Sequence, residues 1–101
     1  MKFFESVYEI VKQIPYGKVT NYGTIARLIG RSDASRIVGY ALHANPDNSL
    51  IPCHRVVTIK GGLSRAFAFG GIEEHKRLLE KEGVFVGEDN KVDMNKYGWM
   101  L

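Results

Sequence analysis

Hydrophobic residues near the start of the chain recur at three- and four-residue intervals, which is typical of an amphipathic helix with one buried face. The apolar positions are Phe3, Phe4, Val7, Ile10, Val11 and Ile14. The run Pro15-Tyr16-Gly17 follows and is expected to end the helix. The pattern therefore predicts a first helix over residues 3–14.

Two shorter helices are predicted next. The first begins near Thr20 or Asn21, either of which is a plausible N-cap, and ends at Gly30. The second follows a turn in which Ser32 or Asp33 provides the cap. Its apolar face carries Ala34, Ile37, Val38, Ala41 and Leu42. Two short helices joined by a glycine-containing turn match a helix-turn-helix, although many helical hairpins share this pattern.

The second half of the chain mixes short strands with one more helix. Residues 45–48 break the preceding helix, and a tight turn over 52–54 leads into a strand over 55–58. Lys60-Gly61-Gly62 is a turn that begins a wing-like hairpin. A helix over 72–82 stops at Gly83, and residues 84–86 and 91–93 form a small terminal hairpin. The prediction is a mostly helical α+β domain over residues 1–101, resembling a winged helix-turn-helix.

Composition places the chain among globular domains. It has 101 residues, of which 45% are hydrophobic and 25% charged. No apolar run approaches the ~18–20 residues that span a bilayer, and no secretory signal is expected, so a membrane association is not predicted. The single cysteine, Cys53, excludes an internal disulfide, and no spaced His/Cys set suggests a metal site. These features favour a reducing compartment, the cytoplasm or the nucleus.

Positive charge is concentrated in the middle of the chain. The net charge is +3, yet the stretch from Tyr16 to Arg65 holds seven basic and only two acidic residues. Such a distribution is consistent with a surface for a polyanion. A solvated face without a partner explains the charge equally well.

Cys53 is the first candidate for chemistry. A free thiol is mostly protonated at neutral pH, so a reactive cysteine needs a base or a positive field nearby. His54 and Arg55 could supply these, and Glu82 could orient the imidazole. Neighbours on a regular strand point to opposite faces, so this arrangement requires a turn or a bridging water. Taken alone, Cys53 is more readily explained as a small apolar core residue.

A wider set of motifs changes this interpretation. The run Ile51-Pro52-Cys53-His54-Arg55-Val56-Val57 resembles the active-site motif of the O6-alkylguanine-DNA alkyltransferase family. The segment over 14–23 is similar to the family's entry into the helix-turn-helix, and the segment over 34–39 to its recognition helix. Asn45-Pro46 resembles the hinge, and the segment over 76–83 the closing helix. The resemblance covers residues 3–83 in the family's order.

The resemblance implies a protein that repairs DNA once and is consumed. Cys53 would displace the alkyl group from guanine O6 and keep it as a thioether, without a cofactor or a metal. His54 would accept the thiol proton through a water, with Glu82 holding the imidazole, and Asn45 would brace the hinge. Tyr22 would donate a proton toward guanine N3, which makes the purine a better leaving group.

The resemblance also implies how DNA is bound. The partner would be double-stranded DNA containing O6-alkylguanine, bound by a monomer through the minor groove. Arg36 would fill the space of the extruded nucleotide. Small residues would let the recognition helix approach the groove closely. The predicted DNA contacts are Tyr22, Ala34, Ser35, Arg36, Gly39 and Arg55.

Two departures leave alternatives open. Many family members carry an amino-terminal domain that has almost no counterpart here, as in alkyltransferase-like proteins, which bind alkylated guanine without repairing it. Those proteins usually have tryptophan at the nucleophile position, whereas this chain has Cys53. The substrate loop over 63–71 is longer than usual, with Phe67 near the expected tyrosine. A lesion sensor and a helix-turn-helix regulator with a structural cysteine therefore remain alternatives. Trp99 lies beyond the matched region and is expected to pack on the core.

Overall fold

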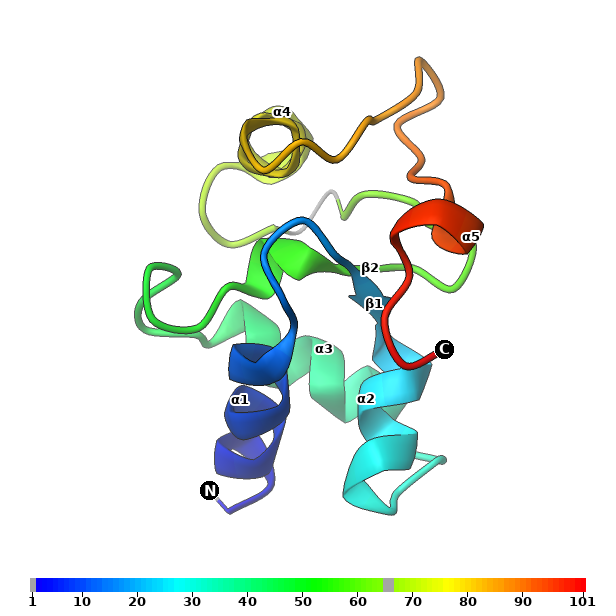
Figure 1. Ribbon diagram of the computed structural model, residues 1–101. Coiled ribbons are helices and arrows are strands. Elements are labelled where there is room, and N and C mark those ends of the chain that lie inside the picture. Colours follow the sequence, from blue (N-terminus) through cyan, green and yellow to red (C-terminus); the bar gives the residue numbers. More distant parts are fainter. Residues whose placement is uncertain (1, 65–66) are drawn as a thin grey trace.

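The computed structural model describes residues 2–64 and 67–101 (Figure 1). Arg65, part of the basic stretch, and Ala66, part of the loop over 63–71, lie outside the described residues. The elements in chain order are α1 (Lys2–Gln13), β1 (Thr20–Asn21), α2 (Tyr22–Ile29), α3 (Ser35–His43), the 3-10 helix η1 (Cys53–Arg55), β2 (Val56–Val57), α4 (Gly71–Lys81) and α5 (Met94–Tyr97). Within this described part, no helix has the length and apolar character needed to cross a bilayer.

Three of the predicted helices pack into one bundle. Helices α1, α2 and α3 contact one another and lie on one side of the small sheet, while α4 lies on the other side and packs against η1 (Figure 1). Val7 and Val11 of α1 are completely buried in the bundle core, as the periodicity predicts. The mixed, mostly helical fold class and the order of its helices are confirmed.

The caps of α2 and α3 differ in kind. At α2, the Asn21 side chain accepts a hydrogen bond from the Thr24 backbone N–H at 2.8 Å, which selects Asn21 over Thr20 as the cap. Gly30 ends this helix with φ +87°, a conformation that favours glycine. At α3, the prediction of a Ser32 or Asp33 cap is wrong. Ala34 occupies that position and gives no side-chain cap, because a turn over 31–34 delays the start of the helix.

The predicted wing is also corrected. The turn itself forms, since Thr58 N–H donates to Gly62 O at 2.9 Å. However, β2 pairs in parallel with β1, with Thr20 opposite Val56, rather than with the residues after the turn. Gly62 instead forms an antiparallel bridge to Lys91 in the carboxyl-terminal segment. Segments distant in the sequence, β1 and the carboxyl-terminal segment, thus pair with the residues that would otherwise form the local hairpin.

The carboxyl-terminal segment completes a second core beneath α4. In place of the predicted terminal hairpin, the structure has a single antiparallel bridge between Val86 and Val92. Leu79 of α4 is fully buried in the same cluster. Gly61, at φ +88°, lies so close to this hairpin that a Cβ would collide with the Val92 carbonyl oxygen. Trp99 packs against the bundle core, as expected.

Candidate active site

The thiol of Cys53 is positioned by a tight turn, as the sequence requires. Pro52 precedes η1, and Arg55 N–H donates to Pro52 O at 3.0 Å. In a 3-10 helix, successive side chains point about 120° apart, so Cys53 and His54 face different surroundings. Cys53 is 5% exposed and His54 6% exposed. The turn therefore directs the thiol to one side and the imidazole to the other.

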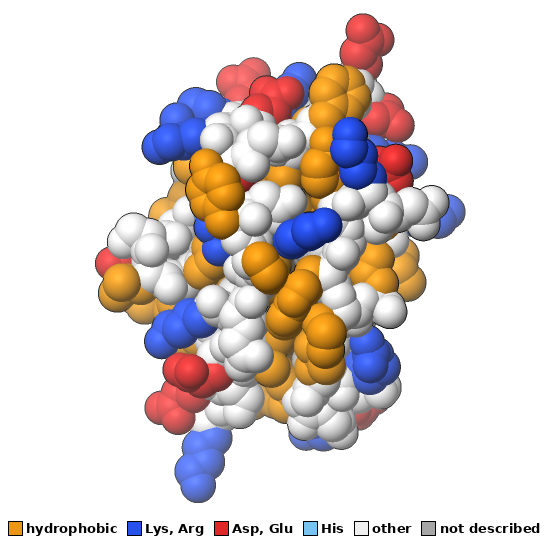
Figure 2. Space-filling model, viewed as in Figure 1, with side chains coloured by type: hydrophobic (Ala, Val, Ile, Leu, Met, Phe, Trp, Pro, Cys, Tyr) orange, Lys and Arg blue, Asp and Glu red, His pale blue; other side chains and the backbone are white. Residues whose placement is uncertain are grey.

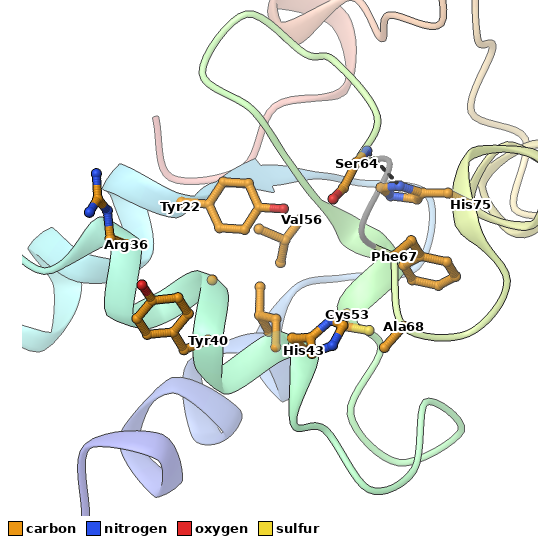
Figure 3. Close-up of a pocket in the computed structure, with 12 residues that line it drawn as sticks. Tyr22, Arg36, Tyr40, His43, Cys53, Val56, Ser64, Phe67, Ala68 and His75 are labelled. Carbon is orange, nitrogen blue, oxygen red and sulfur yellow. Dashed lines mark hydrogen bonds between the residues drawn. The ribbon is translucent and has the colours of Figure 1, made fainter.

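Cys53 lies in the wall of a cavity of about 480 Å³ between α3, η1 and α4. This volume falls in the usual range of sites for small ligands, about 300–1,000 Å³. Figure 3 shows Arg36 at one end, Phe67 and His75 at the other, and the Tyr22 ring pointing into the middle. The other lining residues are Gly39, Tyr40, Leu42, His43, Val56, Ser64 and Ala68.

Glu82, at the end of α4, is the centre of a buried charge network. Arg55 forms a bidentate ion pair with its carboxylate: Nε lies 3.0 Å from Oε1, and a terminal nitrogen lies 2.9 Å from Oε2. The Gly17 backbone N–H donates to Oε1 at 2.9 Å. Burial alone would raise the pKa of Glu82, but the bonds from Arg55, Gly17 and His54 outweigh burial and lower this pKa. Glu82 is therefore a carboxylate.

Arg55, a predicted DNA contact, directs its side chain into the protein. Its side chain is only 16% exposed, and the terminal guanidinium nitrogen that does not contact Glu82 donates to the Ile14 carbonyl at 2.9 Å. The Tyr16 ring lies 5.6 Å from the guanidinium carbon. Because its donors are engaged inside the protein, Arg55 holds α4 to the end of α1 rather than facing a phosphate.

His54 is joined to Glu82 but not directly to Cys53. Its Nε2 lies 2.6 Å from Glu82 Oε2, and its Nδ1 lies 3.1 Å from the side-chain nitrogen of Asn48. Burial lowers the pKa of His54, and the Glu82 bond opposes this only in part, so the imidazole is a neutral base. Burial raises the pKa of the Cys53 thiol, with partial opposition from Asn45 and a backbone N–H.

Asn45 braces the loop that leads to the thiol. Its side-chain nitrogen donates to the Ile51 carbonyl at 2.7 Å, and its side-chain oxygen accepts from the Asp47 N–H at 3.0 Å. These bonds tie the end of α3 to the residue two positions before Cys53. The role of Asn45 as a hinge residue stays a prediction, and these two hydrogen bonds are consistent with it.

Tyr22 is the first residue of α2 and reaches the cavity from the opposite side to η1. The ring is half-buried. Burial raises the pKa of its phenol, and a hydrogen bond with the Ser64 side chain opposes the rise. A phenol that keeps its proton at neutral pH can act as a hydrogen-bond donor inside the cavity.

The residues predicted to line the DNA-facing side of α3 separate into two groups. Ser35 and Arg36 are exposed, and Gly39 is half-buried beside the cavity. Ala34, by contrast, is 1% exposed, so its side chain offers almost no surface to DNA. Ile37, placed on the buried face by its spacing, is 36% exposed.

The basic stretch does not form a continuous patch in the view of Figure 2, where Lys and Arg side chains lie scattered among apolar and polar ones. Several are used within the protein. Arg31 pairs with Asp33 at 3.3 Å, and Arg27 donates to the Met100 carbonyl at 2.8 Å. No cluster of three or more His, Cys, Asp or Glu that could hold a metal ion occurs within residues 2–64 and 67–101.

Two site residues were not predicted. Asn48 appeared only as part of a helix-breaking loop, yet its side chain contacts both Cys53 and His54. His75 is fully buried, donates from Nε2 to the His54 carbonyl at 2.8 Å, and stacks on Phe67 at 4.7 Å. Its position on α4 carries no signal in the sequence. The position of Asn48 does carry a signal, because it lies only five residues before the candidate nucleophile Cys53 in the sequence.

Comparisons with known proteins agree on one family. Residues 2–84 match the family model described as the DNA-binding domain of 6-O-methylguanine DNA methyltransferase. Alkyltransferase-like protein 1 of Schizosaccharomyces pombe is 37% identical over 97% of this chain and 94% of that protein. The methylated-DNA–protein-cysteine methyltransferase of Methanosarcina acetivorans is 43% identical over 81% of this chain, but the match covers only 51% of that protein.

A solved structure gives the same result. The crystal structure of S. pombe Atl1 in complex with damaged DNA containing O6-carboxymethylguanine superposes with a TM-score of 0.88 and 35% identity. The match covers 97% of this chain and 94% of that one. The similar proteins thus include both a methyltransferase, about half of whose length this chain spans, and an alkyltransferase-like protein of nearly equal length.

Proposed function

Because the chain belongs to the family of 6-O-methylguanine DNA methyltransferase DNA-binding domains, we propose that it repairs double-stranded DNA by moving an alkyl group from guanine O6 to Cys53, acting as a monomer. One observation carries this proposal. The only thiol of the chain lies in the wall of a cavity of about 480 Å³, with a hydrogen-bonded His54–Glu82 pair on the adjoining face of the same turn.

The reaction needs no co-reactant. The sulfur of Cys53 forms a bond to the alkyl carbon while the bond from that carbon to O6 breaks, and the electron pair passes to the purine. The thiol proton is taken up by His54, and Tyr22 donates a hydrogen bond to the departing base. The departing base takes up the proton that His54 received from the thiol, so the net products are a thioether and guanine. Since nothing removes the alkyl group, each molecule reacts once.

The target base must leave the duplex to reach the sulfur. Extrusion costs a few kcal/mol because stacking and pairing are lost. Arg36 lies at the end of the cavity away from Phe67 and His75, where it can occupy the space that the base vacates (Figure 3). The exposed Ser35 and the half-buried Gly39 leave room for the backbone of DNA near α3.

The test is intact-mass spectrometry after incubation with a duplex that contains one O6-methylguanine. The wild-type protein is expected to gain one methyl group per molecule, and peptide mapping is expected to place it on Cys53. The Cys53→Ser variant is the matched control and is expected to gain none. Prolonged incubation with excess duplex that leaves the wild-type mass unchanged would contradict the proposal.

A second function, lesion binding without transfer, is favoured by a separate observation. Burial raises the pKa of Cys53, which disfavours the nucleophilic thiolate. The same incubation separates the two functions. Tight binding that prefers the O6-methylguanine duplex, together with an unchanged protein mass, would support the lesion-binding function.

Replacing Arg36 with alanine is expected to slow methyl transfer by about tenfold or more, because the extruded state loses the side chain that fills the stack. Affinity for undamaged duplex is expected to fall much less, since phosphate contacts supply it. Single-turnover rates and a fluorescence binding assay measure the two effects. Arg31→Ala, which removes another exposed arginine, serves as the control. An equal loss of rate and affinity in Arg36→Ala would exclude this role.

A further inference from the structure

The side chain of Asn48 separates the thiol of Cys53 from the imidazole of His54. Its Oδ1 lies 3.0 Å from the Cys53 backbone nitrogen and 3.0 Å from Cys53 Sγ. Its Nδ2 lies 3.1 Å from His54 Nδ1. The other ring nitrogen of His54 is bound to Glu82. The side chains of Cys53, Asn48, His54 and Glu82 thus form one chain of hydrogen bonds. In this chain the Asn48 amide lies between the thiol and the imidazole.

The orientation of this amide is determined by its neighbours. The Cys53 backbone N–H can only donate, so the atom that faces it must be the amide oxygen. The thiol therefore also donates to this oxygen. The amide nitrogen can only donate, so it occupies the lone pair of His54 Nδ1 and leaves the ring proton on Nε2, facing Glu82.

This arrangement has a chemical consequence. A carbonyl oxygen stabilises a thiol that donates to it but repels a thiolate. While the Asn48 amide occupies the lone pair of Nδ1, His54 cannot receive the thiol proton, so transfer requires that this contact first opens. We infer that Asn48 is a positioning residue that holds Cys53 as the neutral thiol and keeps it apart from His54 until the Asn48 side chain moves. Its effect on alkyl transfer rests on the proposed function, whereas its effect on the thiol does not.

Other groups near the thiol also bear on its ionisation. Tyr8 of α1 and Tyr22 of α2 interact electrostatically with Cys53, and Asn45 opposes the effect of burial. His43 of α3 and His75 of α4 line the same cavity, and the Glu82–Arg55 pair lies behind His54. A change at Asn48 must therefore be compared with a change that leaves all of these in place.

Three variants isolate the contact. Asn48→Ala removes all three hydrogen bonds of the amide and is expected to admit water, while the Cys53 N–H keeps the Ile51 carbonyl at 2.7 Å as an acceptor. Asn48→Asp keeps an oxygen for that N–H but adds a negative charge beside the sulfur. Ser49→Ala alters the same loop at a residue whose described side-chain contact is with Asp47. Because Cys53 is the only cysteine, its reaction with iodoacetamide over a pH series reports on this thiol alone.

Asn48→Ala is expected to react about tenfold faster than wild type at pH 7, with the midpoint of its pH profile shifted lower. Asn48→Asp is expected to react more slowly, with a higher midpoint, and Ser49→Ala is expected to match wild type. An unchanged or raised midpoint in Asn48→Ala would overturn the inference. If circular dichroism shows that Asn48→Ala is unfolded, the test uses Asn48→Asp instead. An unchanged or lowered midpoint of the pH profile in Asn48→Asp would then overturn the inference.

The experiment contains no DNA, so it is independent of the proposed repair. Shifted midpoints in a protein that never gains a methyl group would refute the repair function and support the role of Asn48. Where repair does occur, Asn48→Ala is also expected to transfer the methyl group about tenfold faster.

Discussion

Replacing Glu82 with alanine is expected to lower the free energy of unfolding by about 3–5 kcal/mol. The reason is the guanidinium of Arg55, which is 16% exposed and would lose its partner while remaining largely buried. The Gly17 N–H and the His54 ring would each lose an acceptor as well. A domain of this size has about 5–15 kcal/mol of stability in total, so the variant is expected to be close to unfolding.

Urea denaturation followed by circular dichroism measures this effect. Glu74→Ala is a control on the same helix, because Glu74 also pairs with an arginine, but its partner Arg77 has a 60% exposed side chain. Its loss is expected to cost much less, because solvent screens an exposed ion pair. Equal losses in the two variants would show that burial of the Arg55–Glu82 pair does not govern its contribution.

Acid is expected to destabilise the protein because His75 is buried as a neutral ring. Its Nδ1 accepts from the Ser64 N–H at 3.3 Å, and its Nε2–H donates to His54 O. A second ring proton, on Nδ1, would point at the Ser64 N–H and break that hydrogen bond. Burial lowers the pKa of His75 from 6.5 to about 4, with the proton-stabilising bond to His54 O opposing only in part.

The direction of the pH effect depends on the pH at which the folded and the unfolded state each bind a proton on His75. As the pH falls below 6.5, the unfolded chain takes up a proton on His75, whereas the folded protein does so only near pH 4. The stability from this residue is therefore complete above pH 6.5 and falls by about 3 kcal/mol by pH 4. The lowered pKa of His54 acts in the same direction.

Urea titrations at a series of pH values test this expectation. In the interval between pH 6.5 and 4, His75→Gln is expected to show a slope smaller by about one proton, or about 1.4 kcal/mol per pH unit. The comparison uses slopes, so a constant loss of stability in the variant does not affect it. A variant with the slope of the wild type would show that His75 is not the group that titrates.

Local patterns predicted much of this fold correctly. The spacing of Val7 and Val11 is enough to define the buried face of α1, because helical periodicity depends only on near neighbours. Gly30 marked the end of α2 for a similar reason. The predicted cap of α3 failed because of a local turn, whereas the predicted wing and the surroundings of Arg55 depended on distant segments. The wing was lost because β2 pairs with β1, and Arg55 turned inward because Glu82, 27 residues away in the chain, neutralises it.

By itself, the sequence determined helices α1 to α4, the turn at Pro52 and the collinear motifs that identify the family, all of which depend on residues close together in the chain. The short helix α5 was not predicted. The tertiary structure alone decided the surroundings of Cys53. An amide from the loop after Asn45, a carboxylate from the end of α4 and a phenol from the start of α2 meet there, and residue order does not give their distances. Whether a thiol is neutral or reactive depends on those distances, because hydrogen bonds and burial act over a few ångströms.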